Sequence, residues 1–248
     1  MIKRNYYKIV RVFPDPSSYF YIKNETMNEG WIGLFIFTPG RLNEMTLDYS
    51  FDKVNWTRVT EYNKDSIHIP ADGYMYLRNT TGIFGTDTQV FAPHFNISIG
   101  GDIRTLFNYT DVESVTKIPD YGFSYTFTMQ EDSKCIDISN LSFRGITEIG
   151  NYGLQSAFGS GFTATKGVDL RDVTTLGEGA LNSLYSSNSN IKEVYAPNVS
   201  TWDTNKTSWW LNDVAPTGVL YKPSTLTIPI NNDSGVPYGW TTQDYPVE

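Results

Sequence analysis

The loop "GSGFTATKG" (159–167) is rich in glycine, as phosphate-binding loops are. Glycine-rich loops bind phosphate because their backbone N–H groups converge on the anion, and the nucleotide-binding motif requires lysine directly after its last glycine. Here Lys166 precedes Gly167, and the loop leads into a predicted strand where the motif would open a helix. The residue order therefore argues against nucleotide binding.

Histidine chemistry is limited to two residues, His68 and His94, which stand 26 positions apart. Zinc sites and Ser-His-Asp triads need imidazoles spaced on one face or a carboxylate arranged beside them, and neither pattern occurs here. His68 lies between two isoleucines and should point to the polar face of its strand. We predict no metal site and no bound cofactor.

Paired carboxylates are the remaining catalytic possibility. Glycoside hydrolysis uses two carboxyl groups about 5–10 Å apart in a cleft. Asp169 with Asp172, or Glu178 with Glu193, could be placed on one surface, but no pattern singles out either pair. We predict that the protein is not an enzyme, and keep a polysaccharide-cleaving enzyme as a minor alternative.

The single cysteine, Cys135, excludes an internal disulfide and a thiolate metal cage. Its flanking residues, "SKCIDIS", have the alternation of a strand. A thiol in such a strand is more often buried and structural than nucleophilic. We therefore expect Cys135 to be part of the core.

The composition predicts a folded, mainly β protein with short helices. Of 248 residues, 40% are apolar and 15% aromatic, and Tyr, Thr, Ser, Asn and Gly are common. Those residues favour strands and tight turns over long helices. The net charge is −8 and the basic residues are scattered, which argues against nucleic-acid binding.

Membrane insertion and export are also not expected. No apolar run approaches the roughly 20 residues that span a bilayer. The first residues, "MIKRNYYKIVRVF", alternate with polar side chains where a signal peptide would be continuously apolar. The chain therefore shows no visible export signal.

Residues 1–92 show the short, evenly spaced strand patterns of an antiparallel β-sandwich, of the immunoglobulin or fibronectin kind. "WIGLFIF" (31–37) reads as a buried strand. "MTLDYSFDKVNWTRV" alternates on both sides of a turn at Asp52-Lys53 and predicts a hairpin. "SIHIPADGYMYLRN" repeats this scheme around the turn 70–73, and predicts a second hairpin.

Residues 93–248 contain internal copies of one pattern: a helix-compatible stretch, an aromatic or apolar anchor, a polar loop and a short strand. The helix-compatible stretches are "GLQSAF", "GALNSLY" and "WWLNDV", and the strands are "CIDIS", "GVDLRD", "EVYAPN" and "GVLYKP". The anchors Phe127, Phe158, Tyr185 and Val214 are 31, 27 and 29 residues apart. One such unit cannot bury its apolar face alone, so we predict a short leucine-rich-repeat-like solenoid with a parallel strand ladder and an irregular C-terminal cap.

The repeat assigns directions to the tryptophans of "WDTNKTSWWLNDV". Trp210 stands four residues before Val214, where the other copies hold Leu154 and Leu181, so it should face the core. Trp209 has no large apolar counterpart. For Trp209 the core and a binding surface remain equal alternatives.

Two motifs carry a resemblance to a known family. "YSFDKVNW" (49–56) matches a "YSxDxxxW" hairpin, and the ending "GVLYKP" to "GW" is carried by Val219, Tyr221, Lys222, Pro223, Gly239 and Trp240. Over about residues 45–245 the chain resembles the short leucine-rich-repeat proteins of gut Bacteroides and of the crAss-like phages that infect them. The repeats here have "QEDSK", "GSGFT" and "SSNSN" where that family usually has a "GCTSL" motif.

The resemblance, together with the expected lack of an export signal, implies a viral structural protein of a bacteriophage virion, a head fibre or tail appendage used in host attachment. As in the phage relatives, such a protein would be assembled into the virion in the host bacterial cytoplasm. Its implied partners are other virion proteins of the capsid or tail, further copies of itself, and host cell-surface glycan. The alternative is a bacterial cell-surface adhesin or carbohydrate-binding repeat protein. In either case Trp209, Tyr195 and Tyr221 are the candidate surface for glycan or partner.

Overall fold

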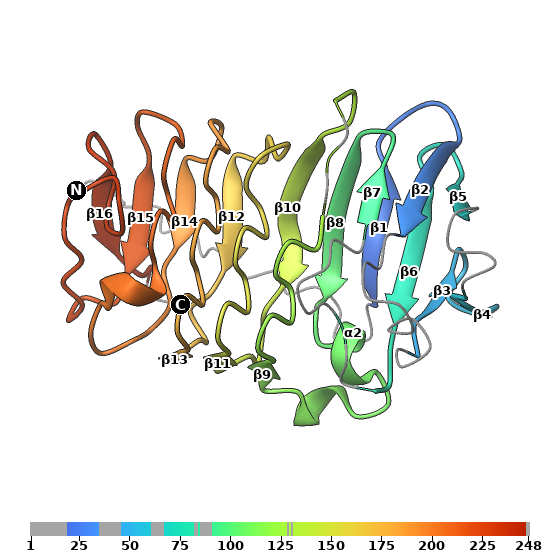
Figure 1. Ribbon diagram of the computed structural model, residues 1–248, viewed down its shortest axis with the longest axis horizontal. Helices are drawn as coiled ribbons and strands as arrows, with labels where there is room; N and C mark the ends of the chain where they lie inside the picture. Colours follow the sequence, from blue (N-terminus) through green and yellow to red (C-terminus); the bar gives the residue numbers. More distant parts are fainter. Residues whose placement is uncertain are drawn as a thin grey trace, which may run out of the picture.

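The computed structural model of the protein describes residues 19–34, 46–60, 67–81, 84, 91–127, 129 and 131–246. It is mainly β, as the composition predicts. Within the described residues, helix is limited to α2 (Thr105–Asn108) and the 3₁₀ turns η1 (Val112–Ser114) and η2 (Thr204–Lys206). The strands lie side by side along the long axis of the molecule (Figure 1).

A six-stranded sheet has the order β10-β8-β1-β6-β3-β4. Its members are β1 (Phe20–Asn24), β3 (Asp48–Ser50), β4 (Thr57–Arg58), β6 (Tyr74–Arg78), β8 (Ile97–Asp102) and β10 (Cys135–Ser142). Pairing is antiparallel from β8 to β4 and parallel between β8 and β10. β8 is thus the strand at which the sheet changes from antiparallel to parallel.

A smaller antiparallel sheet contains β5 (Ile67–Ile69), β2 (Gly30–Leu34) and β7 (Phe91–Pro93), with β2 in the centre. β2 corresponds to the first part of the predicted strand 31–37, and residues 35–37 lie outside the described residues. Ile32 is fully buried, whereas His68 is exposed and pairs with Glu29, as predicted for the polar face of its strand.

The hairpin predicted around Asp52-Lys53 is confirmed, because β3 and β4 pair antiparallel. The turn is held by its own side chains. The Asp52 carboxylate accepts hydrogen bonds from the backbone N–H groups of Val54 and Asn55, and the Trp56 indole N–H donates to the Lys53 carbonyl. The hydrogen bonds from Asn55 and Val54 lower the pKa of Asp52 well below its usual range.

The second predicted hairpin is wrong. β5 and β6 belong to different sheets, so the turn Pro70–Gly73 carries the chain from one sheet to the other. The sequence pattern is the same in both cases, since a turn between two alternating strands does not specify whether those strands pair with each other.

The predicted parallel ladder is present in the second half of the chain. A sheet of order β12-β14-β15-β16 is formed by β12 (Lys166–Asp169), β14 (Glu193–Tyr195), β15 (Val219–Lys222) and β16 (Thr241–Asp244). All its pairs are parallel. The first three strands match predicted ones, and β16 lies in the region predicted as an irregular cap.

The two halves of the chain are joined through strands. β10, from the predicted second domain, pairs with β8, which in turn pairs with β1. A bridge between Cys135 and Phe162 connects β10 to the segment before β12. The division at 92/93 stays a prediction, and a single sheet contains strands from both sides of it.

A third set of strands was not predicted. β9 (Lys117–Ile118), β11 (Glu148–Ile149) and β13 (Thr175–Leu176) form a narrow parallel sheet below the larger ones (Figure 1). Each is only two residues long, which is too short for an alternating pattern to be visible in the sequence.

The predicted helix-compatible stretches are not helices. They are successive turns, and alternate backbone N–H groups donate to carbonyls of the next copy of the pattern along the chain. We call each such copy a coil. Examples are the bonds from Leu154 to Ala180, Ser156 to Asn182 and Phe158 to Leu184. Residues with positive φ recur four apart, for example at Tyr152 and Ser156. Apolar residues three or four apart fit such turns as well as a helix, which explains the error.

The hydrogen bonds between coils also correct the last anchor. Positive φ recurs at Tyr125, Ser156, Ser183 and Trp209, which are 31, 27 and 26 residues apart. The Tyr185 N–H donates to the Trp210 carbonyl, so Leu211 occupies the position that we predicted for Val214. The alignment of the final copy was therefore wrong by three residues.

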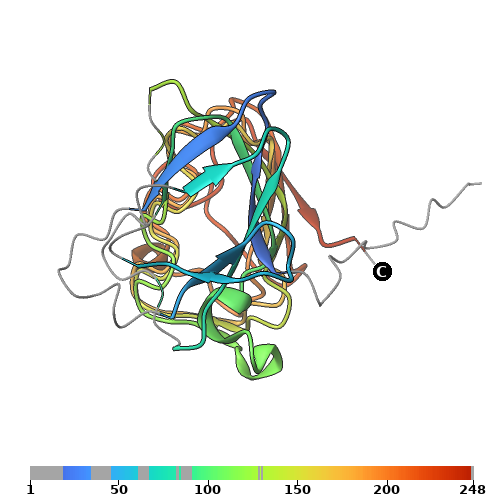
Figure 2. The same ribbon diagram turned by 90° about the vertical axis from the view of Figure 1, so that its right-hand side faces the viewer.

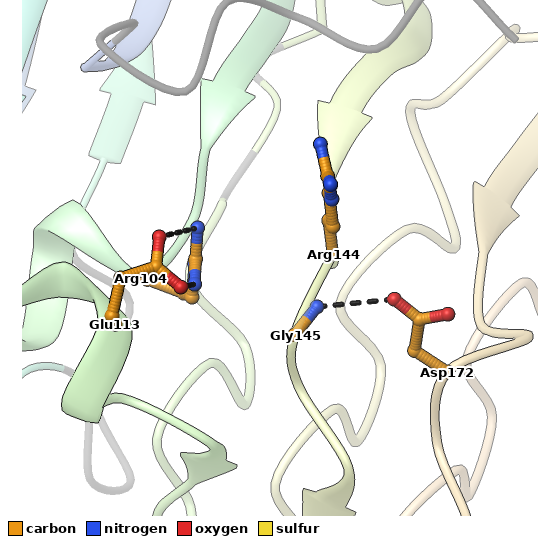
Figure 3. A pocket seen from close by; sticks show the side chains of 5 residues that line it. All are labelled: Arg104, Glu113, Arg144, Gly145 and Asp172. Carbon is orange, nitrogen blue, oxygen red and sulfur yellow. Dashed lines mark hydrogen bonds and ion pairs between the residues drawn. The ribbon is translucent and has the colours of Figure 1, made fainter.

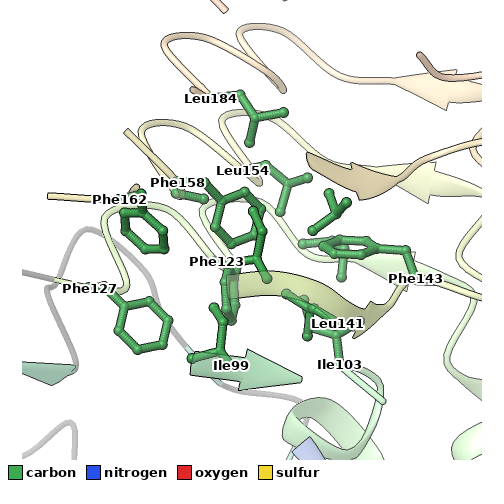
Figure 4. Close-up of a cluster of buried hydrophobic side chains, with 14 of the residues drawn as sticks. Ile99, Ile103, Phe123, Phe127, Leu141, Phe143, Leu154, Phe158, Phe162 and Leu184 are labelled. Carbon is green, nitrogen blue, oxygen red and sulfur yellow. The ribbon is translucent and has the colours of Figure 1, made fainter. Parts of the chain in front are cut away.

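Viewed along the stack, the coils superpose around a shared interior, with the turns on one side and the β12-β14-β15-β16 sheet across from them (Figure 2). Aromatic rings fill that interior. Phe123, Phe158 and Tyr185 form a series with centroid separations of 6.0 and 5.9 Å, and Leu154 and Leu184 pack beside them (Figure 4). The core is continuous between neighbouring coils.

Cys135 is fully buried, as predicted, and burial raises the pKa of its thiol. Because the thiolate is the reactive form, the folded protein should react with a thiol reagent such as Ellman's reagent at least 100-fold more slowly than the protein unfolded in urea. A burst of labelling in the absence of denaturant would contradict this placement.

No helix within the described residues has the length and apolarity to cross a bilayer.

Candidate functional site

Tyr195 and Tyr221 lie side by side on the outer face of the parallel sheet. They are directly paired in register on β14 and β15, and their rings stack at 4.7 Å with an interplanar angle of 16°. Both are half-buried. The structure therefore brings together two of the three predicted surface residues.

The Tyr195 ring is already in contact with cations as well as with Tyr221. The Arg171 guanidinium lies 4.9 Å from the Tyr195 ring centroid and 5.9 Å from that of Tyr245, while Lys166 lies 5.3 Å from Tyr195. The Tyr245 hydroxyl donates to the Ala196 carbonyl at 2.6 Å. A sugar that stacks on Tyr195 would have to displace a cation–π contact.

Trp209 does not join this cluster. It is 58% exposed and belongs to the turns at 208–213. The turns of the stack lie across the core from the parallel sheet (Figure 2). Its positive φ places it in the same position as Ser183 and Ser156 of the earlier coils. Of the two alternatives for Trp209, the structure shows the surface placement.

A row of arginines follows the carboxyl ends of three neighbouring strands. Arg104, Arg144 and Arg171 each stand two residues after the last residue of β8, β10 and β12. In each case the backbone N–H of the arginine donates to a side-chain oxygen of that last residue, which is Asp102, Ser142 or Asp169. This repeated local turn aligns the arginines along one edge of the molecule.

The first two of these arginines line a pocket of about 300 Å³ together with Glu113, Gly145 and Asp172 (Figure 3). Arg144 lies between the Arg104–Glu113 pair and Asp172. Gly145 donates its N–H to Asp172 at 3.1 Å and has a φ of +80°. A Cβ atom at Gly145 would lie 2.9 Å from Arg104 Nη1, so glycine keeps this wall of the pocket open.

Arg104, which lines the pocket, forms a buried ion pair with Asp102. Both side chains are 4% exposed, and Nε and Nη2 donate to the carboxylate at 2.8–3.1 Å. Burial alone would lower the pKa of Arg104, but hydrogen bonds and the charge of Asp102 outweigh it and raise that pKa. Arg104 is thus a fixed cation.

The carboxylate pairs considered from the sequence have separate partners. Asp169 is bonded to Arg171, whereas Asp172 accepts the Gly145 N–H. Glu193 on β14 pairs with Lys166, whereas Glu178 accepts a hydrogen bond from Tyr152 within the turns. Across the part of the chain that the structure describes, no group of three His, Cys, Asp or Glu side chains could hold a metal ion.

The pocket was not predicted. Its residues come from segments as far apart as 104 and 172, and only the Asp-x-Arg spacing at 102–104 and 169–171 gave a local signal. No family model, no curated protein and no solved structure matches the chain. A function for this chain is therefore proposed from the geometry and the residue patterns.

The tyrosines give a prediction for alkaline pH. Burial, and then the charge of Glu193, raise the pKa of Tyr195 to about 12, and burial raises that of Tyr21 to about 12. In the unfolded chain these phenols ionise near pH 10, so the unfolded state loses protons first and stability falls between about pH 10 and 12. The melting temperature should drop in this window, and the double variant Tyr21→Phe/Tyr195→Phe should show a shallower drop. An equal slope in both proteins would contradict the assignment.

Proposed function

We propose that the protein is a structural and attachment component of a bacteriophage virion, a head fibre or tail appendage, that acts without enzymatic activity. We further propose that its parallel ladders belong to a short leucine-rich-repeat-like solenoid at 93–248, preceded by an immunoglobulin- or fibronectin-like β-sandwich at 1–92. The motifs "YSFDKVNW" and "GVLYKP" to "GW" support this family.

The observation that carries the proposal is the way in which the coils are joined. Neighbouring coils share a parallel sheet on one side, a narrow sheet below, and hydrogen-bonded turns opposite. Neighbouring coils are thus joined at more than one place around the stack, which favours a stiff, elongated body. A stiff body that holds side chains outward on several sides suits an appendage that projects from a particle.

The C-terminal edge supports the proposed self-association. All four residues of β16 are exposed, and in the described residues β15 is the strand that pairs with it. An edge strand offers backbone donors and acceptors to another chain. A second copy or another virion protein could extend the sheet there.

The test is to locate the chain. Purified particles of a phage that encodes it should contain the protein by mass spectrometry, and an electron cryomicroscopy map should accommodate the fold in a surface appendage. Detection in the envelope of uninfected cells, together with absence from particles, would contradict the proposal.

A bacterial surface adhesin or carbohydrate-binding module is the second candidate. The exposed Trp209 ring favours it, since exposed aromatic rings commonly pack against sugars. A glycan array read with the wild type and with Trp209→Ala tests this role. Loss of a signal in the variant supports it, and silence of both proteins counts against it.

A further inference from the structure

The pocket between Arg104 and Asp172 has the features of a site for one acidic sugar. We propose that it binds a hexuronic acid residue of a host glycan, whose carboxylate replaces that of Glu113 on Arg104. This deepens the proposed attachment function and rests on it for the source of the glycan. The pocket volume of about 300 Å³ is at the lower end for small-ligand sites, and so fits a single sugar ring.

Glu113 already holds the place of a ligand carboxylate. Its contacts to Arg104 are 3.2 Å at Nη1 and 3.4 Å at Nη2, whereas Asp102 is held as closely as 2.8 Å. The Glu113 side chain is 82% exposed, on the short turn η1. Because the contact is long and the Glu113 carboxylate is exposed, the pair contributes little stability, and a better-placed carboxylate can displace Glu113 at small cost.

Arg104 is suited to receive such a group. Its guanidinium is 4% exposed and is oriented by Asp102, so little side-chain entropy is lost when an anion binds. Nη1 faces Gly145, where the absence of a side chain leaves room beside it. Arg144, an exposed residue on the same wall, provides a second positive charge (Figure 3).

The acidic residues of the pocket select the class of ligand. Asp172 and a displaced Glu113 can accept hydrogen bonds from hydroxyl groups, while the arginines bind the carboxylate. A sugar that carries one carboxylate and several hydroxyls can bind both the arginines and the carboxylates of the pocket. A peptide rich in acidic residues would be repelled by Asp172 and by the net charge of −8.

The proposal is tested by titrating the full chain with sodium glucuronate while following the amide signals of Gly145 and Arg104 by NMR. We expect saturable shifts, no saturation with glucose, and at least tenfold weaker binding of acetate, which lacks the hydroxyls. An acidic peptide such as hexaglutamate should also bind at least tenfold more weakly. Absence of saturation with glucuronate, or tighter binding of the peptide, would overturn the proposal.

Variants separate this site from general electrostatics. Glu113→Gln removes the competing charge and should tighten glucuronate binding about threefold, a factor set by the weakness of a long ion pair whose carboxylate is exposed. Arg144→Gln should weaken it about tenfold or more, as for loss of a hydrogen bond to a charged group. Glu193→Gln alters an exposed ion pair on β14 and should change nothing. Equal effects of Glu113→Gln and Glu193→Gln would contradict the displacement.

Failure of this inference can be told apart from failure of the proposed function. Binding of glucuronate by the purified chain does not depend on where the protein resides. If the protein is found in particles but does not bind glucuronate, only the proposed sugar site is rejected. If the protein binds glucuronate but is absent from particles, only the proposed virion role is rejected.

Discussion

Replacing Trp210 by alanine is expected to lower the free energy of unfolding by about 3–5 kcal/mol, the range for deletion of a buried tryptophan ring. Trp210 is fully buried and its ring centroid lies 4.9 Å from that of Trp202. Its indole N–H donates to the Gly235 carbonyl at 2.8 Å, so the variant also leaves a buried acceptor unpaired. Equilibrium denaturation in urea or guanidinium chloride measures the change.

The neighbouring tryptophan is the control. Trp209→Ala removes a ring that is 58% exposed, and should change the free energy of unfolding by no more than about 0.5 kcal/mol. The backbone cost of positive φ is similar for both residue types at this position. Equal destabilisation by the two substitutions would show that the burial assigned to this turn is wrong.

Asp102→Asn is expected to have an effect of similar size, about 3–5 kcal/mol, because it leaves the Arg104 charge without its main partner. Asparagine preserves the shape of the side chain, so the loss reports the missing charge. With both side chains at 4% exposure, water cannot replace the carboxylate. Glu113 stays near Arg104 but at longer distance. Chemical denaturation followed by circular dichroism measures the loss.

Asp169→Asn makes the same change in the same local motif. Asp169 and Arg171 are 31% and 14% exposed, so solvent compensates the unpaired charge there, and we expect a cost of about 1 kcal/mol. The ratio of the two effects is the informative quantity. A cost at Asp169 equal to that at Asp102 would mean that burial does not set the strength of these pairs.

The strands of the second half were predictable because each has its own apolar signal. Val168, Val194 and Leu220 are buried on β12, β14 and β15, and polar loops separate them in the sequence. A repeated pattern implies stacking, and stacking of like units implies parallel pairing. The hairpin at Asp52 was predictable for the same local reason.

What the sequence could not reveal is non-local. The turns share their apolar spacing with a helix, and they differ through positive φ at non-glycine residues such as Ser156 and Ser183. Hydrogen bonds to the adjacent coil hold that conformation in place, and no short window of sequence contains both partners. The same reason accounts for the error at Val214, since the repeat shortens from 27 to 26 residues and only the paired coil defines the register.

The candidate surface was predicted in part. Tyr195 and Tyr221 are neighbours because their strands pair in register, and Trp209 is remote because it belongs to the turns. Side-chain type indicated which residues stack, but not that Arg171 already covers Tyr195. Occupation of a ring face depends on a side chain 24 positions away in the sequence, which only the folded chain brings close.

The junction at β8 has a consequence for how such a molecule can change over generations. β8 pairs antiparallel with β1 on one side and parallel with β10 on the other. The antiparallel strands are therefore confined to one side of β8, and the repeated parallel strands to the other. Duplication or deletion of a 26- or 27-residue segment beyond it would add or remove a single layer, altering the length by about 4.8 Å and leaving the opposite end intact. The length of the molecule would thus change in discrete steps, without a change in the sheet on the other side of β8.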